Sequence, residues 1–256
     1  MTILVAAYAA LLGLAIGSFI NVVVYRVPRG ESVVNPPSAC PRCGQRVRAR
    51  HNVPVLGWLV LRGRCADCGE PISVRYPLVE AGTGLAFALT ALRFADDLRL
   101  LPAYLAFTAV AIALALIDLD VRRLPDVIVL PSYPVIATLL VLDLDGGALL
   151  RALLGGMALG GFFLAVWLIV PGGMGFGDVK LSGLLGGITA YLSWGALLTG
   201  AFLAFILGAL VGVLLLLRGS GRKTAVPFGP FLLLGAYASI LGASGLGEAY
   251  LSAVGL

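Results

Sequence analysis

The sequence predicts an all-α polytopic membrane protein with about eight transmembrane helices and a small cytoplasmic zinc-knuckle loop domain. Three observations predict this class. Hydrophobic residues make up 60% of the 256 and charged residues only 12%, whereas a soluble domain carries about 25% charged residues. Mean hydropathy is +1.02. Long uncharged runs also separate the charged positions. A single soluble globular domain is therefore excluded.

The charged positions delimit the expected crossings, because a charge at bilayer depth costs several kcal/mol. The eight expected crossings are 3–24, 77–95, 100–117, 127–142, 150–170, 179–194, 197–217 and 227–250. The 37 residues of 181–217 are uncharged, and as one helix they would be about 55 Å long, nearly twice the hydrocarbon thickness. We therefore expect two helices there. Interface and turn residues place the hairpin at Tyr191, Ser193, Trp194 and Gly195.

The loops between eight crossings alternate between two membrane faces, which the positive-inside rule orients. Fifteen Lys and Arg residues fall on one face, and the other face has only Arg93, Arg99 and Arg151. We expect the first face to be cytoplasmic and both termini to lie outside. A single crossing over 181–217 would export the pair Arg222 and Lys223. The first apolar stretch has no basic n-region and continues past the length of a signal peptide, so a retained helix is expected.

Neither nucleic acid nor nucleotide phosphate is an expected partner. Nine of the eighteen basic residues lie in the loop from Arg26 to Arg75, as is typical of a cytoplasmic loop at the surface of the lipid bilayer. No basic helix with interleaved aromatic side chains is present. Close helix packing, rather than phosphate binding, is expected of the cluster Gly155, Gly156, Gly160 and Gly161.

The same loop holds all four cysteines, as two C-x2-C knuckles. Cys40 and Cys43 form the first pair, and Cys65 and Cys68 form the second, with 21 residues between the two pairs. Two such knuckles supply the four thiolates of a tetrahedral Zn²⁺ site. Disulfide or redox use is the alternative, which a reducing cytoplasm disfavours. A closed four-cysteine site has no open position for substrate, so the metal is expected to fold the loop.

Two aspartates lie at the expected cytoplasmic boundary of the membrane. Asp118 is the first charge after an uncharged run, and Asp178 is the last acid before another. Two carboxylates brought together from different helices can share a proton, so that one activates water and the other protonates a carbonyl oxygen. This is the chemistry of aspartic proteases. Gly175 and Gly177 would let a substrate backbone approach the acid closely.

Each acid also has a structural interpretation. Asp118 and Asp178 could form ion pairs, for which the neighbouring cations are Arg122, Arg123 and Lys180. Asp120 and Asp126 are interpreted as interfacial charges, with Asp126 starting a helix after a proline.

Six motifs in order resemble those of the bifunctional type IV prepilin peptidases, which are leader peptidases and N-methyltransferases. They are GSFINVVVYRVP at 17–28, CPRC at 40–43 with NVP at 52–54, LRGRCADC at 61–68 with ISVRYPLVE at 72–80, IDLDVRRLPD at 117–126, MGFGDVKL at 174–181 and PFGPF at 227–231. The resemblance covers almost the whole chain, and the ordered set is far more specific than any single motif.

The resemblance implies that Asp118 and Asp178 are the catalytic pair. It implies type IV prepilins or pseudopilins as substrates, cleaved at the cytoplasmic face after the glycine that ends a short basic leader. It also implies methylation of the new N-terminus from S-adenosylmethionine. Glu80 is the acid expected to bind an amine or the cofactor, with an ion pair to Arg75 as the alternative.

The expected organisation has three parts: a first transmembrane helix at 1–25, a cytoplasmic four-cysteine domain at 26–76, and a seven-helix aspartic peptidase domain at 77–256. The expected location is the bacterial inner membrane. Two other functions stay open. One is a proton-coupled transporter that uses Asp118 and Asp178, although transport sites usually lie near the midplane. The other is a non-catalytic zinc-bearing scaffold.

Overall fold

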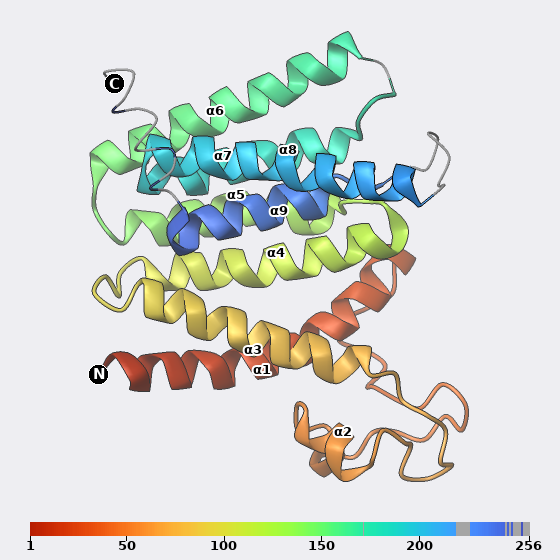
Figure 1. The fold of residues 1–256 in the computed structure, drawn as a ribbon. Coiled ribbons are helices and arrows are strands. Elements are labelled where there is room, and N and C mark those ends of the chain that lie inside the picture. Colours follow the sequence, from red (N-terminus) through yellow and green to blue (C-terminus); the bar gives the residue numbers. More distant parts are fainter. Residues whose placement is uncertain (171, 219–225, 244, 246, 248–251, 253–256) are drawn as a thin grey trace. The chain divides into compact units, whose positions relative to one another are not determined.

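The protein is all-helical in the computed structural model, which describes residues 1–170, 172–218, 226–243, 245, 247 and 252 (Figure 1). Each expected crossing overlaps one helix, and no strand occurs among these residues. The eight helices are α1 Thr2–Arg26, α3 Arg75–Arg93, α4 Leu101–Val121, α5 Asp126–Val141, α6 Gly146–Ile169, α7 Phe176–Leu192, α8 Trp194–Leu217 and α9 Gly229–Ala238. Arg222 and Lys223 lie outside the described residues.

Four of the described helical segments are long and apolar enough to cross a membrane. They are Thr2–Arg29, Leu101–Val121, Gly146–Ile169 and Trp194–Leu217, and the shorter apolar segments are Asp126–Val141 and Gly229–Gly242. Helix α7 has 17 residues and carries Asp178 and Lys180 near its start. A membrane protein is thus confirmed, and the count of eight crossings stays a prediction.

The hairpin expected within 181–217 is present at Ser193. This residue lies between α7 and α8 in an extended conformation, with φ −166° and ψ 162°. Its Oγ accepts a hydrogen bond of 3.0 Å from the backbone amide of Ala196 and so caps the start of α8. The uncharged run therefore forms two helices.

The last helix is shorter than the sequence predicts. Helix α9 ends at Ala238, and a π-helical turn follows at Ser239–Ala243. Gly242 within that turn has φ 136°, a backbone conformation that residues other than glycine rarely adopt. The regular helix is therefore interrupted within the crossing expected at 227–250. Most of the last residues of that expected crossing lie outside the described part of the chain.

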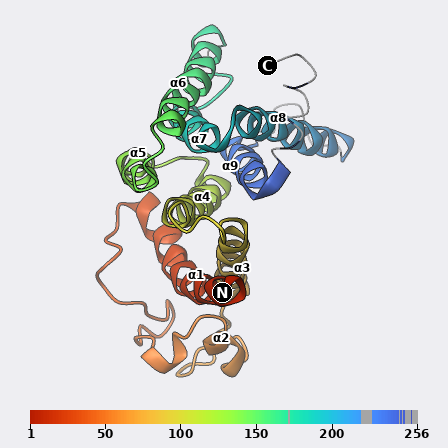
Figure 2. The same cartoon turned by 90° about the vertical axis from the view of Figure 1, so that its left-hand side faces the viewer.

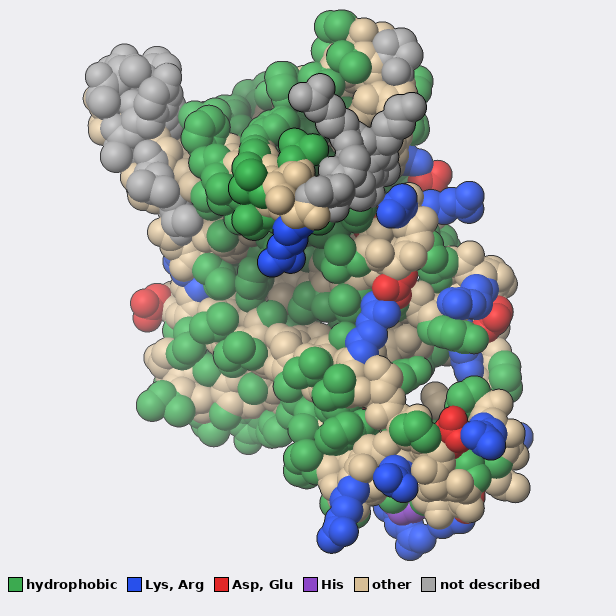
Figure 3. Space-filling model, turned by 45° about the vertical axis from the view of Figure 1, so that its right-hand side comes forward, with side chains coloured by type: hydrophobic (Ala, Val, Ile, Leu, Met, Phe, Trp, Pro, Cys, Tyr) green, Lys and Arg blue, Asp and Glu red, His purple; other side chains and the backbone are tan. Residues whose placement is uncertain are grey.

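The chain divides into two compact units, Met1–Leu101 and Pro102–Leu256. In the first unit α1 and α3 lie side by side in both ribbon views (Figures 1 and 2). A Cβ at Gly17 of α1 would lie 2.8 Å from the Cα of Glu80. The missing side chain thus permits close backbone approach. The loop between these helices contains the short helix α2, Leu56–Val60, and basic side chains gather on its surface (Figure 3).

In the second unit α7 packs against α5, α6, α8 and α9. Glycine contacts bring α6 and α7 together: a Cβ at Gly155 would lie 2.9 Å from the carbonyl oxygen of Gly186. Gly156 and Gly160 also face α7, whereas a Cβ at Gly161 would have no neighbour within 4 Å. Close packing is therefore confirmed for three of the four glycines in this cluster.

Arg151 of α6 stabilises the end of α7. Its guanidinium donates hydrogen bonds to the backbone carbonyls of Ala190, Tyr191 and Leu192, with lengths of 2.6, 2.5 and 3.1 Å. These carbonyls belong to the last turn, where a helix leaves its acceptors without partners and a cation is favoured. Arg151, one of the three basic residues assigned to the outer face, thus has a structural role at the end of α7.

Candidate active site and metal centre

Asp118 and Asp178 both lie in the second unit at helix ends. Asp118 is in the last turn of α4, and Asp178 is in the first turn of α7. Their exposed fractions are 5% and 8%, and they are close enough for a charge on one carboxylate to act on the other. Two nearby buried acids are the arrangement that favours a shared proton.

Neither acid forms an ion pair among the described residues. Lys180, one of the expected cations, instead forms an ion pair with Asp126, which begins α5. The Tyr133 hydroxyl donates a hydrogen bond of 2.5 Å to the Lys180 carbonyl, which adds a second link between α5 and α7. The ion-pair interpretation of Asp118 and Asp178 is therefore wrong for the described part of the chain. The interpretation of Asp126 as a helix-start residue is confirmed.

The GxGD segment begins α7, with Gly175 as the N-cap residue. The backbone amide of Gly175 lies close enough to the Asp178 carboxylate to stabilise its negative charge. A Cβ at Gly175 would meet Asp178 Oδ2 at an ordinary 3.6 Å, whereas a Cβ at Gly177 would lie 3.0 Å from the Cβ of Leu124. Gly177 is thus the more crowded of the two glycines.

The first turn of α9 completes this site from a third part of the chain. The backbone amide of Gly229 lies close enough to the Asp118 carboxylate to stabilise its negative charge. A Cβ at Gly229 would lie only 2.6 Å from Asp118 Oδ2 and 3.4 Å from Leu124 Cδ1. Leu124 therefore borders both Gly177 and Gly229.

No role for Gly229 or Leu124 follows from the sequence alone. The PFGPF motif at 227–231 was visible, but nothing in its residue types connects it to a carboxylate. Asp120 is exposed, in contrast to Asp118, which agrees with its interpretation as an interfacial charge.

The four cysteines form one cluster in the first unit, and all are free thiols. The Sγ atoms of Cys40 and Cys68 are 3.8 Å apart, and those of Cys43 and Cys65 are 4.0 Å apart. All four atoms lie within 4.8 Å of one another. A tetrahedron with zinc–sulfur bonds of about 2.3 Å has sulfur–sulfur edges of about 3.8 Å. The donor set therefore fits a tetrahedral metal ion and does not form disulfides.

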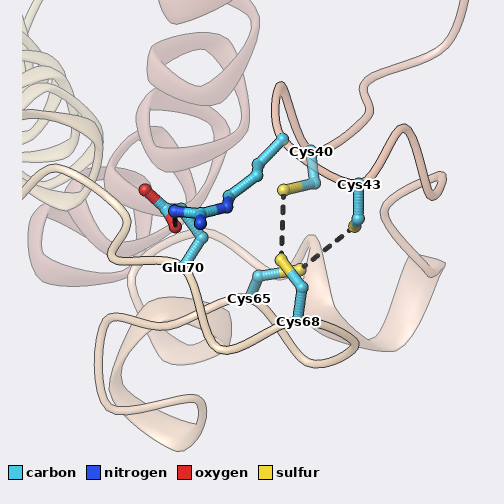
Figure 4. A network of polar contacts seen from close by, with 6 residues as sticks. Cys40, Cys43, Cys65, Cys68 and Glu70 are labelled. Carbon is cyan, nitrogen blue, oxygen red and sulfur yellow. Dashed lines mark hydrogen bonds and ion pairs between the residues drawn. The ribbon is translucent and has the colours of Figure 1, made fainter.

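The sulfur atoms of the four cysteines point toward one another (Figure 4), and the two knuckles that carry them have the same construction. In each, the amide of the first cysteine bonds a carbonyl five residues further on: Cys40 to Gln45 at 2.9 Å, and Cys65 to Glu70 at 2.8 Å. A glycine with positive φ closes each turn, 70° at Gly44 and 73° at Gly69. Only glycine adopts this conformation without strain.

Charged contacts join one knuckle to the other. Arg42 contacts Glu70 at 2.5 Å, and Arg48 forms an ion pair with Asp67. Hydrogen bonds from the backbone amides of Cys43 and Arg42 lower the pKa of the Cys40 thiol to about 7. Since metals bind the thiolate, this shift favours coordination at Cys40. Desolvation by burial and sulfur–sulfur hydrogen bonds instead raise the pKa of the Cys68 thiol, to about 12, and the pKa of Cys43 is also raised.

Glu80 is buried on α3, with an exposed fraction of 8%. Its Oε2 accepts a hydrogen bond of 2.7 Å from the backbone amide of Val55, at the start of α2. Val55 has φ 61°, which is rare for a β-branched residue. The structure therefore gives Glu80 a contact that joins the loop to α3, and its expected part in methylation stays a prediction.

Comparison with known proteins identifies both units. Residues 11–94 match the model of the Bacterial Peptidase A24 N-terminal domain, and residues 105–213 match that of the Type IV leader peptidase family. No solved structure matches the chain.

Several curated relatives are named prepilin leader peptidase/N-methyltransferase, including the following three. The one from Pseudomonas putida is 40% identical, over 91% of this chain and 89% of its own length. Those from Aeromonas hydrophila and Pseudomonas aeruginosa are each 36% identical, over 94% and 96% of this chain and 92% and 93% of their own lengths. The chain therefore belongs to the type IV leader peptidase family.

Proposed function

We propose that the chain is a membrane aspartic endopeptidase that removes the leader from type IV prepilins or pseudopilins. The proposed cleavage follows a glycine at the cytoplasmic membrane face. The observation that carries this proposal is the pair of buried acids, Asp118 and Asp178, which lie near each other at helix ends and have no cation partner among the described residues. The names and high coverage of the curated relatives support the choice of substrate.

In the proposed reaction one carboxylate accepts a proton from water, and the resulting hydroxide attacks the carbonyl carbon of the leader glycine. The other carboxylic acid donates its proton to the carbonyl oxygen. Collapse of the tetrahedral intermediate breaks the carbon–nitrogen bond, and the amine leaves with a proton from the dyad. Two carboxyl groups that share one proton can fill both roles, because the ionised group acts as the base and the protonated group acts as the acid.

Substrate geometry agrees with this placement. A prepilin presents a basic leader in the cytoplasm and an apolar helix in the bilayer, so its scissile bond lies at the interface. Asp118 and Asp178 are at the ends of their helices, where an interfacial bond can reach them. Gly175 and Gly177 are the residues we assign to the substrate backbone, because an unwound peptide bond is accessible whereas a helical one is shielded.

We also propose methylation of the new N-terminal residue, because the relatives are named N-methyltransferases as well. S-adenosylmethionine would supply the methyl group. Glu80 is the acid in the first unit that we would test for binding the amine. Zinc is the metal we assign to Cys40, Cys43, Cys65 and Cys68, where it would fold the loop.

The proposed location is the inner membrane, with the catalytic face cytoplasmic and both termini outside. The charge count of the loops supports this orientation. The proposed functional parts are a first helix at 1–25, the four-cysteine domain at 26–76 and the peptidase domain at 77–256. A transporter is disfavoured because both acids lie at helix ends, and a scaffold leaves their buried pairing without a purpose.

The deciding experiment is a reconstituted reaction with a synthetic prepilin, followed by intact mass. Loss of the leader reports cleavage, and addition of one methyl group to the product reports methylation. We expect both changes in proteoliposomes that contain S-adenosylmethionine, and cleavage alone when it is omitted. An unchanged prepilin mass with folded, zinc-loaded protein would reject the peptidase proposal.

A further inference from the structure

The two acids have different electrostatic surroundings within their own helices. Asp178 lies in the first turn of α7, where the helix dipole and unpaired amides favour an anion. Asp118 lies in the last turn of α4, where the dipole opposes an anion. The carboxylate of Asp118 therefore needs a compensating donor from outside its own helix.

The start of α9 provides that donor. Gly229 is the first residue of α9, so its amide has no acceptor within the helix. This amide lies beside the Asp118 carboxylate, close enough to stabilise its negative charge. The N-terminal end of α9 thus supplies the favourable charge that the C-terminal end of α4 lacks.

The carboxylate also occupies the space in which a side chain of residue 229 would lie. A Cβ there would be 2.6 Å from Asp118 Oδ2 and 3.3 Å from its Cγ. Real Cβ atoms essentially never show contacts under 3.0 Å. Any larger residue at this position must displace the carboxylate or the start of α9.

Aromatic packing fixes the position of this amide. The ring of Phe228, the residue before α9, lies 5.4 Å from the ring of Phe205 on α8 and 6.2 Å from that of Phe163 on α6. Pro230 follows as a buried residue in the first turn. The backbone around Gly229 is thus held between three helices rather than exposed on a loop.

We propose that Gly229 is a positioning residue for Asp118: its amide and its missing side chain together set the rotamer in which this carboxylate faces Asp178. The structural part of this inference is independent of the activity, and its catalytic consequence rests on the proposed peptidase function. The two parts are therefore tested by separate measurements.

The first measurement is a double-mutant cycle in thermal stability, with Gly229→Ala, Asp118→Ala and the double variant. Gly229→Ala in the wild-type background should lower Tm by about 5 °C, because an overpacked site of this kind is destabilising. In the Asp118→Ala background both crowded atoms are gone, and the next neighbour, Leu124 Cδ1, is at 3.4 Å. The same substitution should then change Tm by less than about 2 °C. Equal Tm losses in both backgrounds would refute the contact.

The matched control is Gly212→Ala on α8, where a Cβ would have no neighbour within 4 Å. Its effect on Tm should be the same whether or not Asp118 is present. This control separates the specific contact from a general response of the helices to alanine.

The second measurement is a kinetic comparison on a synthetic prepilin. Gly229→Ala should lower kcat by about 100-fold, as a misplaced catalytic group does. KM should stay within about twofold, because the proposed role of Gly229 is to position Asp118 and not to bind substrate. Gly212→Ala should retain the wild-type kcat. A coupled Tm cycle with unchanged kcat would show a packing contact only and overturn the positioning role. If wild-type protein cleaves no prepilin, the proposed function fails, and the Tm cycle still decides whether Gly229 holds Asp118.

Discussion

The cysteine cluster and the carboxylate site are assembled in opposite ways. Each knuckle is a closed local turn, and two copies of the same turn bring four thiols within 4.8 Å. The carboxylate site instead gathers one residue from the end of α4, one from the start of α7 and an amide from the start of α9. The first arrangement offers four thiol donors, the full set for a tetrahedral metal ion. In the second, neither acid forms an ion pair with another described residue. The comparison indicates a structural role for one region and a chemical role for the other.

The largest expected effect is the loss of the dyad. Asp118→Ala and Asp178→Ala should each abolish cleavage, because a pair that shares one proton fails when either member is removed. The measurement is leader removal from a synthetic prepilin in purified membranes. Asp120→Ala and Asp126→Ala are the matched controls and should leave measurable activity. Normal turnover by either dyad variant would show that the chemistry lies elsewhere.

A large effect is also expected from bulk at Gly177. Gly177→Val should lower cleavage by about 100-fold while the protein stays folded and zinc-loaded. The control Gly161→Val, at a position where a Cβ would have no neighbour within 4 Å, should not lower cleavage. Because Gly177 also faces Leu124, the double variant Gly177→Val with Leu124→Ala distinguishes two causes. Continued loss of cleavage supports a path for the substrate backbone. Recovery to the wild-type rate would show that the glycine serves only the packing of Leu124.

Removal of the metal should affect the first region and spare the helices. We expect one zinc ion per chain, and chelation or Cys43→Ser should open the loop to proteolysis at its arginines, since the binding energy of such a site is largely folding energy. Helical circular dichroism should change little. Metal analysis gives the stoichiometry, and thiol titration gives the redox state. Absence of zinc together with two disulfides would reverse the assignment.

The smallest expected effect concerns the ion pair between Asp126 and Lys180. Asp126 is 57% exposed as a side chain and Lys180 is 22% exposed, and pairs of this kind contribute about 0–1 kcal/mol. Asp126→Asn should therefore lower kcat/KM only a few-fold, and Asp120→Asn provides a charge-matched control. Complete loss of cleavage by Asp126→Asn would place this acid in the catalytic machinery and break the distinction between the dyad and its neighbours.

The same comparison explains what could be predicted from the sequence. Helix positions, the hairpin at Ser193 and the clustering of the cysteines depend on local signals: uncharged runs, a capping serine and C-x2-C spacing. The contact of Gly229 with Asp118 depends on how α4 and α9 pack, for which a single sequence offers no local signal. The hydrogen bond between Glu80 and Val55 likewise joins residues far apart in the sequence, and so does the ion pair between Lys180 and Asp126. Gly242 could have indicated the interruption after α9, but a glycine within an apolar run is equally compatible with helix.

The central claim is that Asp118 and Asp178 act as one unit, and its most direct test uses isosteric variants. Cleavage rates of a synthetic prepilin by Asp118→Asn, Asp178→Asn and the double variant should be measured by intact mass in the same proteoliposomes. The account predicts that the double variant is no slower than either single variant, since removing one member already disables the pair. Two partial losses that multiply in the double variant would show that the acids act independently and would contradict a shared-proton dyad.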